Sequence, residues 1–398
     1  MSQKVEFIDR AMKPGARMSS LCREYGISRE TGYKWLGRFK REGPDGLEEH
    51  SRRPHATPLA TAEEVVAAVL ELRERYPRRG PKKLVVLLRS KLGAATPSVA
   101  TVARILKRFG MVRQKSLFRR APSLVERPPE MRATSPNELW TVDFKGWWAS
   151  RDGQRCEPLT VRDAFSRFIL AIKVLASPSM SQTRAAFTAL FKKYGVPAAI
   201  QVDNGTPFIN VRARGGLTGL SAWWVSLGIQ VVRSRRGCPQ DNGAHERMHR
   251  DMRADLQAFP AGSRLAEQRA CDRWRLEFNR VRPHEALGGK TPSDLYRRSE
   301  RRPVKTSFMY PPDWIVRTVR EQGRIKVAHT DVHIGMALVR ERIALQPLGG
   351  ASHRIWFREL DLGTVELPPP NHVIDAMVRR HLDRPLKKAQ RRGPSKAA

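Results

Sequence analysis

Leu139-Trp140-Thr141-Val142-Asp143-Phe144 is an apolar, β-rich run that carries a single carboxylate. The run predicts a buried strand, and a carboxylate on such a strand is costly unless a partner neutralises it. Two more acids stand in comparable places. Asp203 follows the apolar run 198–202 and precedes a turn signal, and Glu246 lies in the first turns of a helix that begins near Asn242. Carboxylates in such positions indicate a metal site.

The segment around these acids, residues 137–260, predicts an α/β domain. Its pattern favours three strands, a helix, a strand, a helix, a strand and a final helix. That order makes a mixed sheet with helices on both faces, which is the arrangement of a ribonuclease H-like fold. The expected strands cover residues 139–147, 157–163, 168–176, 198–202 and 229–234, and the expected helices cover residues 182–194, 217–227 and 242–259.

The N-terminal part of the chain predicts two helix-turn-helix domains, at residues 1–53 and 60–113. Each ends in a basic helix that begins after a capping serine, Ser28 in the first domain and Ser98 in the second. A small helical bundle with a solvated basic side is the alternative for the first domain. The side chains expected to contact DNA are Arg29, Tyr33, Lys34 and Arg38 in the first domain, and Arg104, Lys107 and Arg108 in the second.

The remaining segments complete a multidomain α/β protein. Residues 114–136 predict a basic linker, and residues 261–303 a helical extension of the catalytic core. Short alternating strands at 324–327, 337–339, 343–345 and 354–357 predict a small antiparallel β-barrel over residues 310–366. Residues 367–398 predict a basic tail.

The chain is strongly basic. Lys and Arg number 74 against 39 Asp and Glu, which gives a net charge of +35 and an isoelectric point near 11.1. This excess fits a polyanionic partner, and double-stranded DNA is the expected one. We expect a soluble protein without a membrane partner, because no signal peptide is recognisable and no apolar run approaches the ~18 residues of a membrane span. The widely spaced cysteines are typical of reduced thiols in a cytoplasm.

The three acids suit phosphoryl transfer. Carboxylates from two strands and one helix can hold two Mg²⁺ ions ~3.5–4 Å apart, one activating a nucleophile and one stabilising the leaving oxygen. Oxygen ligands also favour hard cations over zinc. Arg250 and Arg253 follow Glu246 by four and seven residues, on the same helix face. We expect them to hold the phosphates that flank the scissile bond.

A competing motif overlaps the third acid. His245-Glu246-Arg247-Met248-His249 fits the H-E-x-x-H pattern, in which two histidines on one helix face bind zinc and the glutamate acts as general base. The flanks are rich in arginine, and no glycine and histidine follow at the extended spacing of such proteases. A protease would also leave Asp143, Asp203 and the positive charge unexplained, so we favour phosphoryl transfer.

Four motifs resemble those of bacterial insertion-sequence transposases with a retroviral-integrase-like catalytic core. They are residues 140–146 around Asp143, 202–208 around Asp203, 238–247 ending in His245-Glu246-Arg247, and Arg282-Pro283-His284-Glu285-Ala286-Leu287. The resemblance covers roughly residues 1–300. It implies a DDE triad of Asp143, Asp203 and Glu246, a ribonuclease H-like core, dependence on Mg²⁺ with Mn²⁺ as a substitute, and N-terminal domains that bind terminal inverted repeats.

The chain departs from this family in one spacing. Glu246 follows Asp203 by 246 − 203 = 43 residues, which is longer than usual for the family, and residues 212–216 resemble an inserted loop. The departure leaves Asp241 and Asp251 as alternatives for the third acid. The histidine and cysteine zinc domain of retroviral integrases is not recognisable in this sequence.

The sequence therefore leads to the hypothesis of a DNA transposase that joins the 3′ ends of its element to target DNA. Bringing two ends together implies at least a dimer on DNA. The same features predict a cytoplasmic, nucleoid-associated protein. The alternative is a sequence-specific DNA-binding protein that has kept the core as a scaffold and lost catalysis.

Overall fold

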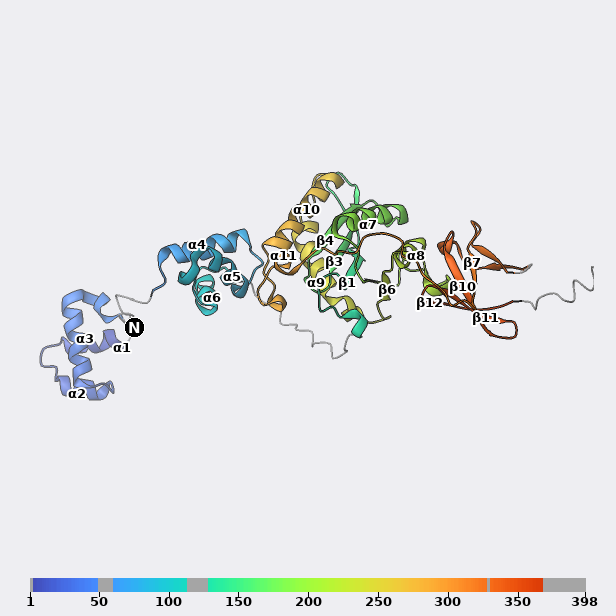
Figure 1. Ribbon diagram of the computed structural model, residues 1–398. Helices are drawn as coiled ribbons and strands as arrows, with labels where there is room; N and C mark the ends of the chain where they lie inside the picture. Colours follow the sequence, from blue (N-terminus) through green and yellow to red (C-terminus); the bar gives the residue numbers. More distant parts are fainter. Residues whose placement is uncertain (1–2, 49–59, 113–127, 328–329, 368–398) are drawn as a thin grey trace, which may run out of the picture. The chain divides into compact units, whose positions relative to one another are not determined.

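The computed structural model describes residues 3–48, 60–112, 128–327 and 330–367. The chain forms two units, Met1–Val66 and Ala67–Ala398, which are considered separately below. Figure 1 labels their helices and strands. The expected basic tail lies outside the described residues except for Leu367, and so does the linker up to residue 127.

The described residues of the first unit include helices α1 (Gln3–Ala11), α2 (Met18–Glu24) and α3 (Arg29–Glu42), followed by a 3₁₀ turn at Gly43–Leu47. Ser28 caps α3 by accepting a hydrogen bond from the backbone N–H of Thr31, as its sequence position predicts. Gly32 lies against α1 and α2, where an added Cβ would come within 2.5 Å of Cys22 Sγ. The small core of this unit consists of Phe7, Ile8, Leu21, Cys22 and Leu47.

The second unit begins within helix α4 (Glu63–Arg75) and continues with α5 (Pro81–Leu92) and α6 (Val99–Arg108). Ser98 caps α6 through the backbone N–H of Thr101. This helix is strongly two-sided: Val102, Ile105 and Leu106 are buried while its basic residues are exposed. Helix, turn and capped basic helix are therefore present in both predicted DNA-binding segments.

The catalytic core predicted for residues 137–260 contains a mixed sheet in the order β2-β3-β1-β5-β6, with β4 on the outer edge of β3. β1 pairs antiparallel with β3 and parallel with β5, so it is central. This confirms the mixed sheet expected from the order of elements. The strands are β1 (Leu139–Phe144), β2 (Trp148–Ala149), β3 (Arg155–Asp163), β4 (Ile169–Leu175), β5 (Ala199–Val202) and β6 (Gln230–Arg233).

Helices cover both faces of this sheet. On one face, α7 (Met180–Tyr194) and α8 (Gly219–Ser226) enclose an apolar core that includes Trp140, Val142 and Val202. On the other face lie α9 (Gly243–Met252), a π-helical turn at Arg253–Gln257 and α10 (Arg264–Arg280). The helix predicted at 242–259 is thus an α-helix that widens into a π-turn.

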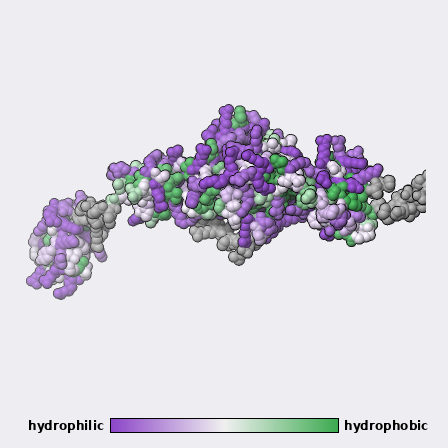
Figure 2. All heavy atoms as spheres, viewed as in Figure 1, coloured by the Kyte–Doolittle hydropathy of each residue, from purple (hydrophilic) through white to green (hydrophobic). Residues whose placement is uncertain are grey.

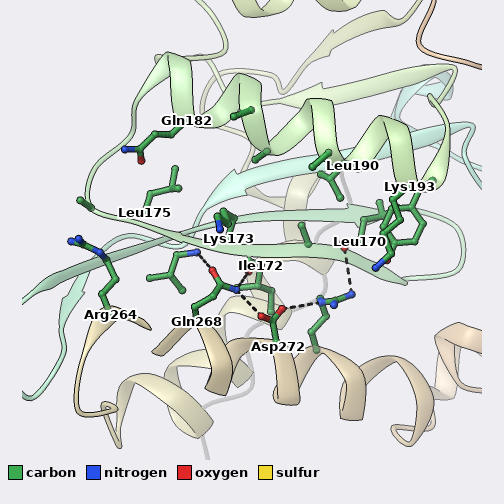
Figure 3. Close-up of a pocket in the computed structure, with 18 residues that line it drawn as sticks. Leu170, Ile172, Lys173, Leu175, Gln182, Leu190, Lys193, Arg264, Gln268 and Asp272 are labelled. Atoms are coloured by element: carbon green, nitrogen blue, oxygen red, sulfur yellow. Dashed lines mark hydrogen bonds and ion pairs between the residues drawn. The ribbon is translucent and has the colours of Figure 1, made fainter. Parts of the chain in front are cut away.

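Helix α10 covers the free edge of the sheet at β4. The Gln268 amide donates to Ile172 O and accepts from Val174 N, and Asn279 makes the same pair of bonds with Ile169. Side chains thereby replace a neighbouring strand and block edge pairing. A cavity of about 690 Å³ lies at this edge. Figure 3 shows it with α7 above and α10 below.

The predicted small β-barrel is not confirmed, because the described strands form two open sheets. One sheet has the order β12-β11-β10-β7 and the other pairs β8 with β9. Their apolar faces share a core with Leu217, Ala222 and Val225, so α8 covers them and closure is not required. Residues 336–338 form a 3₁₀ turn in place of an expected strand. The strands are β7 (Ile315–Thr318), β8 (Arg324–Val327), β9 (Thr330–His333), β10 (Arg342–Gly349), β11 (Ser352–Phe357) and β12 (Leu360–Glu366).

The loop that lengthens the spacing between Asp203 and Glu246 packs on this C-terminal sheet. Arg214 donates hydrogen bonds to the carbonyls of Leu362 and Thr364 in β12. Gly215 has φ +60° and lies so close to Leu362 that a Cβ would come within 2.5 Å of its Cδ2. The inserted residues therefore attach the C-terminal sheet to the core.

Hydrophilic residues dominate the face of the molecule seen in Figure 2. Within the described ranges, no helix combines the length and apolar character needed to cross a membrane.

Candidate active site on one face of the sheet

Strand alternation directs Asp143 and Asp203 to the sheet face that α9 covers. Thr141 faces this helix, since its hydroxyl hydrogen-bonds His245 Nδ1 at 2.9 Å. Asp143 is two residues further along β1 and shares that face. In β5, Gln201 donates to the Asp241 carbonyl just before α9, and Asp203 follows two residues later. Because β1 and β5 are parallel and pair Thr141 with Gln201, the two aspartates lie at the same end of neighbouring strands.

Helix α9 brings the third predicted acid to the same region. Glu246 is in its first turn and is exposed, whereas His245 and His249 are buried against the sheet. The residue before the helix, Asn242, provides no side-chain cap and instead directs its amide to Asp143 Oδ2, at 3.5 Å. The start of α9 is thereby held over the end of β1.

The charges of the three acids act on one another. Burial, with the negative charges of Asp203 and Glu246 acting in the same direction, raises the pKa of the Asp143 carboxyl to about 7. The Phe144 N–H and the Lys145 ammonium oppose this rise. Burial and then Arg253 lower the pKa of Lys145. Asp143, Asp203, Glu246, Lys145 and Arg253 thus form one electrostatic cluster.

Thr160 of β3 connects α9 to the backbone of the first acid. Its hydroxyl donates to the Asp143 carbonyl at 2.9 Å and lies 2.6 and 2.8 Å from Nε2 of His245 and His249. A hydroxyl has one proton, so both imidazoles must donate from Nε2. The Nδ1 of His245 then accepts from Thr141, and burial lowers the pKa of His245 well below its usual value.

The second histidine is also neutral. Burial, followed by the charges of Lys145 and Arg162, lowers the pKa of His249 to about 3. Its Nδ1 lies 3.8 Å from Asp143 Oδ2, too far for a hydrogen bond. Since both rings are turned onto the sheet while Glu246 points to solvent, the H-E-x-x-H residues do not present a zinc site with a neighbouring base.

The ligand type and the charge of this cluster suit a divalent metal ion, but the spacing of its side chains does not. Carboxylate oxygens suit Mg²⁺, and the crowding that raises the Asp143 pKa is the repulsion that a cation would relieve. Over the described ranges, no three His, Cys, Asp or Glu side chains are gathered closely enough to hold a metal ion. The acids therefore meet the requirement of charge and ligand type without forming a closed metal cage.

The two alternative third acids are engaged elsewhere. Asp241 is buried and pairs with Arg235 at 2.7 Å. Asp251 pairs with Arg282, beside α10. Neither is among the charges that shift the Asp143 pKa most, whereas Glu246 is.

The residues predicted to bind DNA lie in the places that the sequence indicates. Arg29, Tyr33 and Lys34 are exposed on α3, and Arg38 is half-buried. Trp35, Leu36 and Phe39 of that helix pack on the core of the unit instead. Helix α6 exposes Arg104, Lys107 and Arg108. Arg250 is exposed on α9, and Arg253 is exposed at the start of the π-turn.

Sequence reasoning did not identify Thr141, Thr160, Asn242 and Lys145 as parts of the site. The two threonines stand at polar positions within apolar strands, on the same alternation as Asp143. That alternation was the available signal, because a polar residue repeated on one face of a buried strand needs a partner.

Family comparisons assign domains to most of these segments. An integrase core domain matches residues 133–239, and a second integrase core domain matches residues 227–292. A helix-turn-helix domain matches residues 3–55, and a homeodomain-like domain matches residues 31–106. The predicted helix-turn-helix segments and integrase-like core are thus confirmed as domain types.

Two relatives come from bacterial insertion elements. The insertion element IS476 uncharacterized 39.2 kDa protein of Xanthomonas euvesicatoria is 26% identical over 63% of this chain and 69% of its own length. The insertion element IS407 uncharacterized 31.7 kDa protein of Burkholderia multivorans is 26% identical over 60% of this chain and 83% of its own length.

Solved integrase structures align with parts of the chain at low similarity. The HTLV-2 integrase catalytic core domain in complex with magnesium has 18% identity and a TM-score of 0.31, over 42% of this chain and 100% of that one. The simian T-cell lymphotropic virus intasome has 16% identity and a TM-score of 0.35, over 75% of this chain and 99% of that one. The domain matches and the insertion-element relatives, taken together, support a bacterial insertion-sequence transposase with an integrase-like core.

Proposed function

We propose that the protein cleaves at the 3′ ends of its element and joins those ends to target DNA, with Asp143, Asp203 and Glu246 as the catalytic residues. The observation that carries this proposal is the shared face of the sheet. Two aspartates lie at the same end of neighbouring parallel strands, the helix beside them carries the glutamate in its first turn, and the charges of Asp203 and Glu246 both raise the pKa of Asp143. Acids that repel one another at the end of a sheet indicate a place for cations.

The triad would hold Mg²⁺, with Mn²⁺ as a substitute. When bound, two such ions would activate a water or a 3′ hydroxyl as nucleophile and stabilise the leaving oxygen. No side chain is then needed as a covalent nucleophile. The histidines contribute by position, since their bonds to Thr160 hold α9, and with it Glu246, against β1 and β3.

Basic residues beside the triad would orient the DNA. Lys145 and Arg253 belong to the same electrostatic cluster as Asp143. Arg250 is exposed on α9, one turn after Glu246. These cations would hold the phosphates around the scissile bond, where a small displacement of the substrate is costly to the rate.

The helix-turn-helix domains would supply sequence recognition. Exposed side chains of α3 and α6 would contact the terminal inverted repeats, with basic residues on the phosphates and Tyr33 within reach of base edges. Two ends must be held together for joining, so the working form would be at least a dimer on DNA. The protein would act in the bacterial cytoplasm, at the nucleoid.

The test is an assay with labelled element-end duplex and a target plasmid, with Mg²⁺ or with EDTA. We expect Mg²⁺-dependent 3′-end cleavage and joined products from the wild-type chain. Asp143→Asn or Asp203→Asn should remove both products while end binding remains. Joining retained by either variant would refute the catalytic assignment. Binding without products from the wild-type chain would instead support the DNA-binding protein that lacks catalysis.

A further inference from the structure

We propose that a cavity between α5, α9 and the segment after α10 binds a backbone phosphate of duplex DNA. The cavity has a volume of about 350 Å³. Five cations line it, Lys83, Arg162, Arg167, Arg247 and Arg282, against two carboxylates, Asp251 and Glu285. None of these cations is among the residues that the sequence predicts to contact DNA. Part of the lining is the motif at residues 282–287, for which the catalytic site gives no role.

Both carboxylates of this cavity are already paired. Asp251 forms an ion pair with Arg282, and Glu285 forms one with Lys82 at 2.8 Å. Arg162 and Arg167 have partners of their own. No ion pair is recorded for Lys83 and Arg247 within the described part of the chain, and these two lie on different helices. They are the cations that an incoming anion would meet.

Burial and the positive charges around this cavity lower the pKa values of Lys83 and His284. Burial, then Arg282, lowers the pKa of Lys83, with Arg79 and Arg247 acting in the same direction. Burial lowers the pKa of His284 to about 3, helped by Arg282, Arg167 and Lys83. The Nε2 of His284 is buried without a hydrogen-bond partner among the described residues. An anion would relieve this mutual repulsion of cations.

The position of the cavity favours DNA as the source of the phosphate. Lys83 belongs to α5 of the second helix-turn-helix segment, and Arg247 follows Glu246 on α9. A second cavity of about 480 Å³ shares Lys83, Arg247, Asp251 and Arg282 with the first. Two adjoining cationic hollows suit successive phosphates of one strand better than a single free phosphate. A strand held here would run from the recognition domain to the helix that carries the third acid.

The inference rests on the proposed function only in taking DNA as the partner, and its test needs no catalysis. Binding of a fluorescent element-end duplex is measured by anisotropy in EDTA, over a series of KCl concentrations. For Lys83→Gln and for Arg247→Gln we expect severalfold weaker binding and a salt slope smaller by about 1, because each loses a phosphate contact. The double variant should lose about 2 from the slope.

The matched control is Arg89→Gln, which removes an exposed cation from the same helix α5 but lies outside both cavities. Lys83→Arg keeps the charge and should keep the slope. Equal losses in Arg89→Gln, or unchanged affinity and slope in the double variant, would overturn the proposal. The two proposals can fail separately. If the cavity variants reduce the salt slope of DNA binding while the wild type gives no Mg²⁺-dependent products, the proposed function is overturned and this inference stands.

Discussion

The two faces of the central sheet are built from the same strands, but they carry different kinds of side chain. On the α7 and α8 face, alternate residues such as Trp140, Val142 and Val161 are fully buried among apolar side chains. On the α9 face, the intervening residues are Thr141, Asp143 and Thr160. The first face is apolar throughout its core. The second face has an apolar cluster where β4 meets α10, but at β1 and β3 it holds polar groups that would be costly to bury elsewhere.

The largest loss of stability should come from the apolar face. Phe187 is fully buried and its ring contacts Phe191 and Trp224, with centroids 5.5 and 4.7 Å away. Phe187→Ala removes these contacts and leaves a cavity, which costs about 3–5 kcal/mol. We expect a lower urea midpoint for the core, with joining activity per folded molecule preserved. Loss of activity in molecules that remain folded would show that the two faces are not separate in role.

A smaller effect on stability but a larger one on activity should follow Thr160→Val. The substitution leaves two buried imidazole N–H groups without their acceptor, at a cost of about 1–3 kcal/mol. It also frees α9 from β3, so cleavage and joining should fall in protein that remains folded. The measurements are the urea midpoint and the Mg²⁺-dependent yield of joined products.

The matched control for this variant is the neighbouring residue on the opposite face. Val161→Thr buries an unpaired hydroxyl in the apolar core and should cost a similar free energy. Its activity per folded molecule should stay near that of the wild type. Equal losses of activity in the two variants would remove the special role of the Thr160 network.

The smallest predicted effect concerns pH. The pKa of His284 is about 3 in the folded protein and near 6.5 in the unfolded chain, because burial and adjacent arginines oppose its charging. Between these values the unfolded chain binds more protons, so the free energy of unfolding falls as pH falls from 6.5. His284→Gln should flatten this fall, as measured by urea midpoints from pH 7 to pH 4.5. An unchanged pH profile would place the acid sensitivity in other groups.

The sequence predicted the elements of the core well and their partners less well. Capping serines, strand alternation and turn signals are local, so Ser28, Ser98 and the strand of Asp143 were identified correctly. The covering of a sheet is not local. The alternating strands at the C-terminus indicated one apolar face each but not that α8 would cover it, so a closed barrel was expected.

The same limit explains the histidines and the inserted loop. The H-E-x-x-H spacing predicts two histidines on one helix face, which is correct, but it does not say that this face meets Thr160. The sequence predicts residues 212–216 to be an inserted loop, but it does not predict that this loop contacts β12. In both cases the sequence pattern predicts how the residues are placed along the chain. Their structural role depends on the element against which they pack, which the pattern does not give.

The central claim is that Glu246, on the helix over the two aspartates, completes the catalytic set. The direct measurement compares Mg²⁺-dependent joining by Glu246→Gln, Asp241→Asn and Asp251→Asn, each at matched folded concentration. Glu246→Gln should bind the element end normally and give no joined product. The two aspartate variants lose ion pairs with Arg235 and Arg282, and should still join. The assignment would be contradicted if Glu246→Gln joined DNA as well as the wild type does. It would also be contradicted if joining were lost only in Asp241→Asn or in Asp251→Asn.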